Sequence, residues 1–82
     1  MKDLFALDDD LLQWEAQLAA LHGVPRVYLL ARLAWHLRQR DAVRAAALAA
    51  EAMPLLFLLP EAEQAALTAR FTLIGEIGRA HV

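Results

Sequence analysis

The residues best suited to bind a ligand in this 82-residue sequence are arginines near its middle. Residues 25–44 hold five arginines and one aspartate, a balance of +4. Three of these arginines and one tryptophan form a candidate interaction surface: Arg32, Trp35, Arg38 and Arg40. A guanidinium fork matches the geometry of phosphate, so a phosphate or nucleotide site is one interpretation. The interpretation that we favour is that these arginines form salt bridges to residues 1–24. That segment is acidic, with one lysine, four aspartates and one glutamate.

The other titratable residues lack the spacing of a metal or catalytic site. His22, His36 and His81 show neither HxxxH nor ExxH spacing, so we predict no metal site. The three aspartates at positions 8–10 are interpreted as the start of a helix, and neither Glu15 nor Glu51 has a titratable neighbour at catalytic spacing. The chain lacks Cys and Ser, which excludes thiolate and serine-hydrolase chemistry. The sequence therefore predicts no enzyme activity and no cofactor.

Charge and hydropathy argue against two further classes of partner. The chain has a net charge of −2 and no interleaving of basic and aromatic residues, so we expect no nucleic-acid binding. The most apolar run, Leu55 to Leu59, lies between two prolines and is far shorter than the roughly 20 residues of a membrane span. The first residues lack the pattern of a signal peptide, and we expect a cytoplasmic protein.

Composition predicts that helices position all of these residues. Alanine (18) and leucine (17) supply 35 of the 82 residues, and both are strong helix formers. Apolar periodicity and the placement of glycine and proline predict helices over about residues 9–22, 25–40 and 42–53, and a fourth from about residue 60. Pro54 is expected to force Met53 out of helical geometry, with a buried turn or a short helical piece following it. The fold class is therefore all-α.

The second and third predicted helices carry residues suited to close packing. Asp41 is the expected N-cap of the third helix, because its carboxylate can accept a backbone N–H from the first turn. The residues expected to pack between the two helices are Leu33, Ala34, Ala45, Ala49 and Ala52. A face of alanines has little apolar area to bury, so its expected role is to let another helix backbone come close.

Residues 26–58 resemble a tetratricopeptide repeat, a pair of antiparallel helices of about 34 residues. Three elements carry the resemblance: Leu33-Ala34, the turn Arg40-Asp41, and Ala45 with Ala52 seven residues later. The resemblance implies antiparallel helical hairpins in a right-handed stack. The sequence departs from the family pattern in an interval one residue too short, a missing aromatic and a displaced closing proline.

The phrases LAWHLRQRD and RAAALAAEA are similar to the N-terminal helical region of bacterial signalling proteins that end in a GGDEF diguanylate cyclase domain. This resemblance implies a non-catalytic protein-interaction or sensory module whose partner is another protein or a covalently linked C-terminal output domain. None of the cyclase residues is present, so that activity does not carry over. Two alternatives stay open: a free-standing helical adaptor that forms a homodimer, and a helical domain that binds a small ligand or phosphate.

The last residues, Glu76 to Val82, match the translation of a widely used sequencing-library adapter. We therefore expect one domain over residues 1–75, a non-native tail over residues 76–82, and a natural protein that continues beyond Gly75. The fourth helix would then be half of a truncated second repeat. Its apolar residues Leu67, Phe71, Leu73 and Ile74 would lack a partner and drive self-association through residues 64–75.

Overall fold

Segments rich in alanine and leucine become helices, and proline, glycine and aspartate mark where they begin and end. The computed structural model describes residues 8–80, and within this range it contains helices and no strand. The elements are α1 (Asp8–Leu18), α2 (Gly23–Leu37), α3 (Ala42–Ala52), the 3₁₀ helix η1 (Met53–Leu58) and α4 (Glu61–Ala80). The predicted all-α class with about four helices is confirmed.

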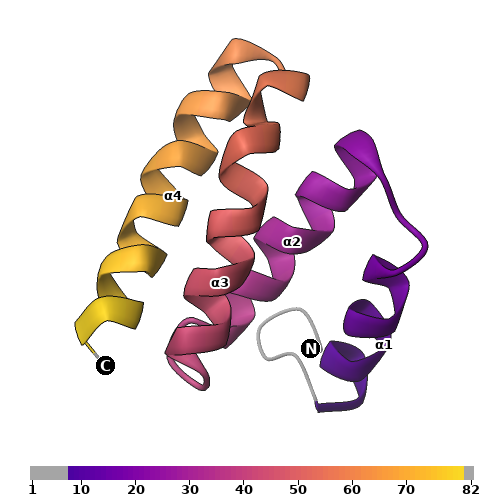
Figure 1. The fold of residues 1–82 in the computed structure, drawn as a ribbon, viewed down its shortest axis with the longest axis vertical. Coiled ribbons are helices and arrows are strands. Elements are labelled where there is room, and N and C mark those ends of the chain that lie inside the picture. The colour runs from indigo at the N-terminus through magenta and orange to yellow at the C-terminus, as the bar shows by residue number, and fades with distance from the viewer. Residues whose placement is uncertain (1–7, 81–82) are drawn as a thin grey trace.

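Helix α3 lies at the centre of the arrangement (Figure 1). Helix α4 runs antiparallel beside it, and α2 crosses behind it and contacts both α3 and α4. Helix α1 packs on the far side of α2. Because α2 and α4 both run opposite to α3, their chain directions agree, and the surface between them is bordered by two roughly parallel helices.

The predicted start of the third helix at Asp41 is confirmed, whereas the predicted end of the first helix, just before Gly23, is wrong. Asp41 is the N-cap of α3, and its Oδ1 accepts the backbone N–H of Arg44 at 3.1 Å. The first helix, predicted to extend to His22, ends at Leu18, because a turn begins at Ala19 and the Arg26 guanidinium binds the carbonyl oxygens of Leu18 and Leu21. Gly23, at φ +66°, opens α2 instead of closing α1.

The third helix ends at Ala52, close to the predicted residue, but Pro54 does not force Met53 out of helical geometry. Met53 keeps helical geometry, with φ −53° and ψ −48°, and a 3₁₀ helix continues from it through Leu58. Pro54 stands in the first turn of this helix, where a missing N–H leaves no hydrogen bond unmade. The short helical piece, one of the two predicted outcomes, is therefore the correct one.

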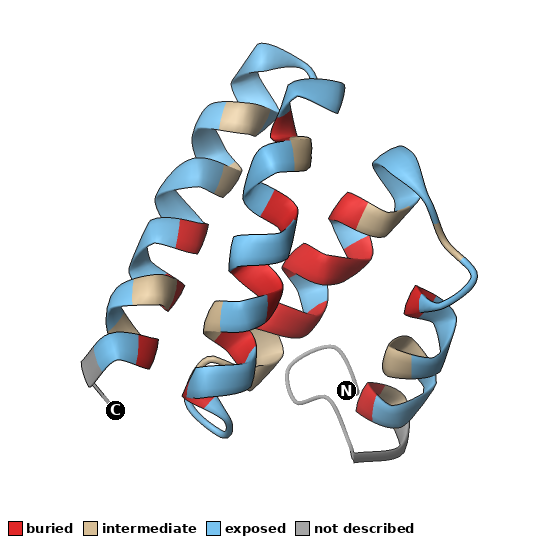
Figure 2. Ribbon diagram, viewed as in Figure 1, coloured by how far each residue is buried: buried red, intermediate tan, exposed pale blue. Residues whose placement is uncertain are grey.

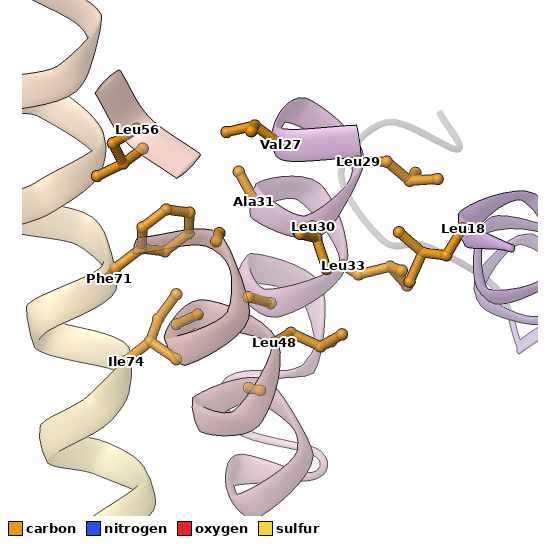
Figure 3. Close-up of a cluster of buried hydrophobic side chains, with 14 of the residues drawn as sticks. Leu18, Val27, Leu29, Leu30, Ala31, Leu33, Leu48, Leu56, Phe71 and Ile74 are labelled. Atoms are coloured by element: carbon orange, nitrogen blue, oxygen red, sulfur yellow. The ribbon is translucent and has the colours of Figure 1, made fainter. Parts of the chain in front are cut away.

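The five predicted packing residues, Leu33, Ala34, Ala45, Ala49 and Ala52, are all buried. Figure 2 shows that the buried positions of α2, α3 and α4 face one another. The largest fully buried side chains around them are Leu30, Leu33, Leu48, Ile74 and Val27. The alanines thus lie where neighbouring helices approach α3, and the leucines fill the space beside them (Figure 3).

The expectation that α4 exposes its apolar face is wrong. Phe71 and Ile74 are buried, and Figure 3 shows both pointing from α4 toward α3. Leu67 packs partly against the same core, and only Leu73 of the four predicted residues is exposed. Helix α4 buries this face on α3 and α2, so it needs no second helix of its own to cover it.

Residues 76–80, in the segment predicted to be a tail, form the last turns of α4. Gly78 is buried, and a Cβ added to it would lie 2.6 Å from Ala46 Cβ and 3.0 Å from the carbonyl oxygen of Ala42. The glycine therefore allows α4 to approach the start of α3 closely. A non-native origin for residues 76–82 stays a prediction, and His81 lies outside the described residues.

Replacing Ala45 by leucine tests the small-residue contact at α3. Ala45 is fully buried, so Ala45→Leu should overpack the contact and lower the free energy of unfolding by about 1–3 kcal/mol. The matched control is Ala50→Leu on the exposed face of the same helix, which should change it by no more than about 0.5 kcal/mol. Urea unfolding measures both, and equal effects would mean that Ala45 is not at a close helix contact.

Two glycines of α4 provide a paired test of its docking. Gly78→Ala should destabilise the fold, because overpacking costs about 1–3 kcal/mol and exceeds the gain in helix propensity. Gly75→Ala meets no atom within 4 Å and should stabilise the helix by about 0.5–1 kcal/mol. Thermal melts of the two variants should therefore shift in opposite directions. A stabilising Gly78→Ala would show that α4 does not pack on Ala42 and Ala46.

Candidate functional site

A groove of about 660 Å³ lies between α2 and α4. Tyr28, Leu29, Ala31, Arg32, Trp35, His36, Glu63, Ala66, Leu67 and Arg70 line it. Alanines and leucines provide apolar surface within the groove, and the aromatic and charged side chains carry its polar groups. The groove lies between helices that run in the same direction, and each helix contributes a small side chain to its lining, Ala31 from α2 and Ala66 from α4.

Two side-chain contacts bridge the helices along this groove. At one end, the Tyr28 hydroxyl donates a hydrogen bond of 2.8 Å to Glu63 Oε2. At the other, the guanidinium carbon of Arg70 lies 4.7 Å from the centre of the Trp35 ring. Both contacts join residues 35 positions apart, so the two helices keep one register along the groove. The hydrogen bond to Glu63, more than desolvation or the negative charge of that carboxylate, raises the pKa of Tyr28 above its ordinary value.

A second guanidinium group, that of Arg38, lies over the Trp35 ring. Arg38 lies with its guanidinium carbon 3.8 Å from the ring centre, and its Nη1 donates a hydrogen bond of 2.6 Å to the Trp35 carbonyl oxygen. A cation over an indole face is attracted by the negative face of the ring. Trp35 therefore holds two arginines, one from each border of the groove, in defined positions.

Helix α1 contributes a second tryptophan beside the groove. The guanidinium carbon of Arg32 lies 4.7 Å from the Trp14 ring centre, and the rings of Trp14 and His36 are 5.3 Å apart at 49°. Desolvation lowers the pKa of His36, and the positive charges of Arg32 and Arg38 lower it further. Arg32 is thereby oriented by an aromatic ring, as Arg38 is.

The structure brings together three of the four predicted surface residues. Arg32 and Trp35 line the groove, and Arg38 lies against Trp35. Arg40 lies elsewhere, beside a shallower depression of about 370 Å³ between α1 and the turn before α3. The sequence analysis missed Tyr28, Glu63 and Arg70. Their common signal is the 35-residue spacing of Tyr28 to Glu63 and of Trp35 to Arg70, which is close to a repeat length.

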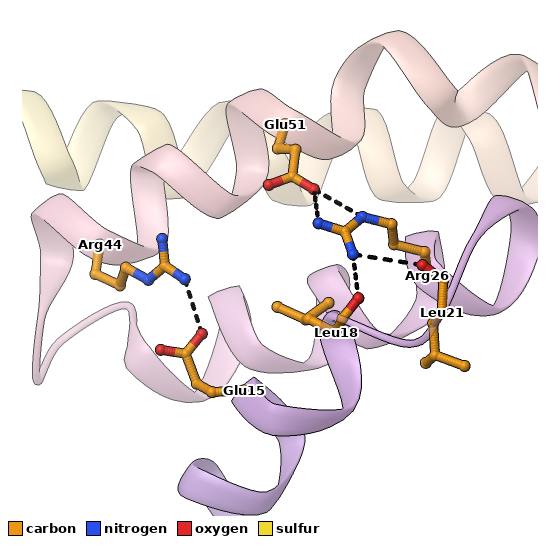
Figure 4. Close-up of polar contacts among 6 residues, drawn as sticks. All are labelled: Glu15, Leu18, Leu21, Arg26, Arg44 and Glu51. Carbon is orange, nitrogen blue, oxygen red and sulfur yellow. Dashed lines mark hydrogen bonds and ion pairs between the residues drawn. The ribbon is translucent and has the colours of Figure 1, made fainter.

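Arg44 forms a salt bridge to the first helix, as predicted. Arg44 Nη2 lies 2.8 Å from Glu15 Oε1 and links α3 to α1 (Figure 4). Arg26 instead binds Glu51 of α3, with Nη2 2.6 Å from Oε2. The salt-bridge prediction is therefore confirmed for Arg44, whereas Arg32 and Arg38 lie on tryptophan rings.

Residues 8–80 contain neither a cluster of metal ligands nor a membrane-spanning helix. In that range, no three histidine, aspartate or glutamate side chains come together in a way that could hold a metal ion. Nor does any helix between residues 8 and 80 have the length and apolar character of a membrane span.

Comparison of the sequence with protein-family models and with curated proteins, and of the structure with solved structures, finds no match. The fold and the geometry of the groove therefore provide the grounds for a functional proposal.

The position of His36 predicts a pH dependence of stability. Its pKa is lowered in the folded state, whereas an unfolded histidine titrates near 6.5. Below about pH 6.5, His36 is therefore protonated to a greater extent in the unfolded chain than in the folded one. Proton binding then favours the unfolded chain, so the free energy of unfolding should fall as the pH drops.

Urea unfolding at about pH 7.5 and about pH 5.5, for the wild type and for His36→Gln, isolates this contribution. The wild type should lose more stability than the variant over this range. The opposite result would mean that attraction between the Trp14 ring and a protonated His36 outweighs desolvation and the two arginines.

Proposed function

We propose that this chain is a non-catalytic protein-interaction module that binds a segment of a partner protein in the groove between α2 and α4. The observation that carries the proposal is the groove itself, which combines apolar surface with fixed aromatic and guanidinium groups. Such a combination is typical of a recognition site, where apolar burial supplies affinity and a few placed polar groups supply specificity. The bridging contacts at its two ends connect α2 to α4 across the groove.

The arrangement of helices supports a repeat-like origin for this groove. Helices α2 and α3 form an antiparallel pair, and α4 follows with the direction of α2. The 35-residue register between α2 and α4 is close to the roughly 34 residues of a tetratricopeptide repeat. On this proposal, α2 and α3 are one repeat, α4 is the first helix of the next, and the groove lies between equivalent helices.

A wider proposal concerns the protein to which this module belongs. The similarity of residues 33–52 to helical regions of bacterial signalling proteins supports a place in the N-terminal part of such a protein, in the cytoplasm. A GGDEF diguanylate cyclase domain is the proposed output domain. Its partner would be either that linked domain or a separate protein.

The titratable groups of the groove agree with a non-catalytic role. Glu63 is the one carboxylate among the lining residues, and it accepts a hydrogen bond from Tyr28. His36 lies against Trp14, with two arginines nearby that disfavour its protonation. General acid–base catalysis needs an acid and a base that converge on one reacting atom, and these two groups have other contacts.

Filling the groove tests the proposed function. Peptides are first selected from a random display library for binding to the wild type. Because an indole at position 66 would occupy the groove, these peptides should bind Ala66→Trp at least about tenfold more weakly, a loss of about 1.4 kcal/mol. Ala65→Trp adds the same indole at an exposed position of α4 that does not line the groove, and it should bind within about twofold of the wild type. Circular dichroism verifies that both variants fold. Equal binding by both would mean that the peptides bind outside the groove.

A further inference from the structure

One end of the groove concentrates positive charge that the described part of the chain does not neutralise. Arg38 and Arg70 lie over the Trp35 ring, and Arg32, three residues before Trp35 on α2, lies over the Trp14 ring. Among the described residues, the ion pairs of Arg26 and Arg44 use Glu51 and Glu15, and no carboxylate pairs with any of these three arginines. The groove's own carboxylate, Glu63, lies at the opposite end against Tyr28. The groove is thus basic at one end and acidic at the other.

We infer that the partner segment is an extended acidic peptide whose carboxylates bind Arg38 and Arg70 at Trp35 and Arg32 beside it in the groove. This inference rests on the proposed function and specifies the chemistry of the partner. A guanidinium group binds a carboxylate through two parallel hydrogen bonds, and stacking on indole fixes its orientation beforehand. Less side-chain freedom is then lost on binding, which raises affinity.

The dimensions of the groove indicate how the peptide lies in it. The two bridging contacts are seven residues apart on each helix, which corresponds to about 10 Å at 1.5 Å per residue. An extended chain covers that distance with about three residues. The acidic side chains lie at the Trp35 end, and an apolar side chain lies on the alanine and leucine surface toward Tyr28. Acidic residues at both ends are disfavoured, because Glu63 would repel the second carboxylate.

A nucleotide fits this arrangement less well than a peptide. Stacking of a base needs an aromatic face, and guanidinium groups from Arg38 and Arg70 already lie over the Trp35 ring. A triphosphate long enough to reach along the groove would also approach Glu63. The observations therefore favour carboxylates carried on an extended, partly apolar chain.

Fluorescence anisotropy with two labelled peptides tests this inference. One peptide carries glutamates followed by leucines, and the other has glutamine in place of each glutamate. The acidic peptide should bind the full chain at least about tenfold more tightly at low salt, since hydrogen bonds to charged groups contribute more than neutral ones. The difference should shrink as added salt screens the charges.

Variants on α4 identify the arginines responsible. Arg70→Gln should weaken the acidic peptide by about tenfold and leave the glutamine peptide within about twofold, because it removes a charge and retains an amide. Arg79→Gln removes the same charge from an exposed position of the same helix outside the groove, and it should leave the affinity of both peptides unchanged. Equal effects of Arg70→Gln and Arg79→Gln would overturn the inference, since only overall charge would then matter.

The remaining outcomes separate this inference from the proposed function. If both peptides bind equally and Ala66→Trp blocks both, the groove binds peptides but the acidic partner is wrong. If inorganic phosphate or ATP binds and neither these peptides nor those from the display library do, both proposals are overturned in favour of a small-anion site. If sedimentation at low salt shows a dimer that Arg70→Gln dissociates, the occupant is a second copy of this chain and the acidic partner segment is again wrong.

Discussion

The groove and the helices around it depend on one constraint, the alanine face of α3. Ala45, Ala49 and Ala52 are buried where neighbouring helices pack on α3. Because the alanines project only a methyl group, the backbones come close, and the larger side chains Leu48 and Phe71 fill the space beside the contacts. Helices α2 and α4 both run opposite to α3, so they lie side by side with the same direction. The groove is a consequence of this geometry.

A domain of this size gains limited stability from apolar burial, and Arg26 adds a polar connection between three helices. Its guanidinium group binds the carbonyl oxygen of Leu18 at the end of α1, that of Leu21 in the loop that follows, and the carboxylate of Glu51 on α3 (Figure 4). The carbonyls at a helix C-terminus have no hydrogen-bond partner within the helix and carry partial negative charge. A guanidinium group there donates hydrogen bonds to them and also compensates the negative charge. One side chain of α2 therefore orients α1 and α3 relative to each other.

Five arginines divide into two classes by their contacts. Arg26 and Arg44 pair with carboxylates and connect helices. Arg32, Arg38 and Arg70 lie on indole rings, where the attraction positions the guanidinium group without cancelling its charge. Stacked guanidinium groups can still form hydrogen bonds with their edges. Residues 25–44 thus contribute arginines to the contacts between helices and, together with Arg70, to the proposed recognition surface.

The sequence by itself determined the helical class, the N-cap at Asp41 and the buried alanines of α3. These features depend on local propensity and on periodicity along one helix, which a sequence contains directly. Only the tertiary structure decided that Phe71 and Ile74 are covered, that α1 ends at Leu18, and that Tyr28, Glu63 and Arg70 join Arg32 and Trp35 in one groove. The physical reason is that each of these outcomes depends on contacts between residues of different helices. The end of α1 depends on Arg26 of α2, and the burial of α4 and the groove depend on how α2 and α4 pack on α3, which no local sequence pattern contains.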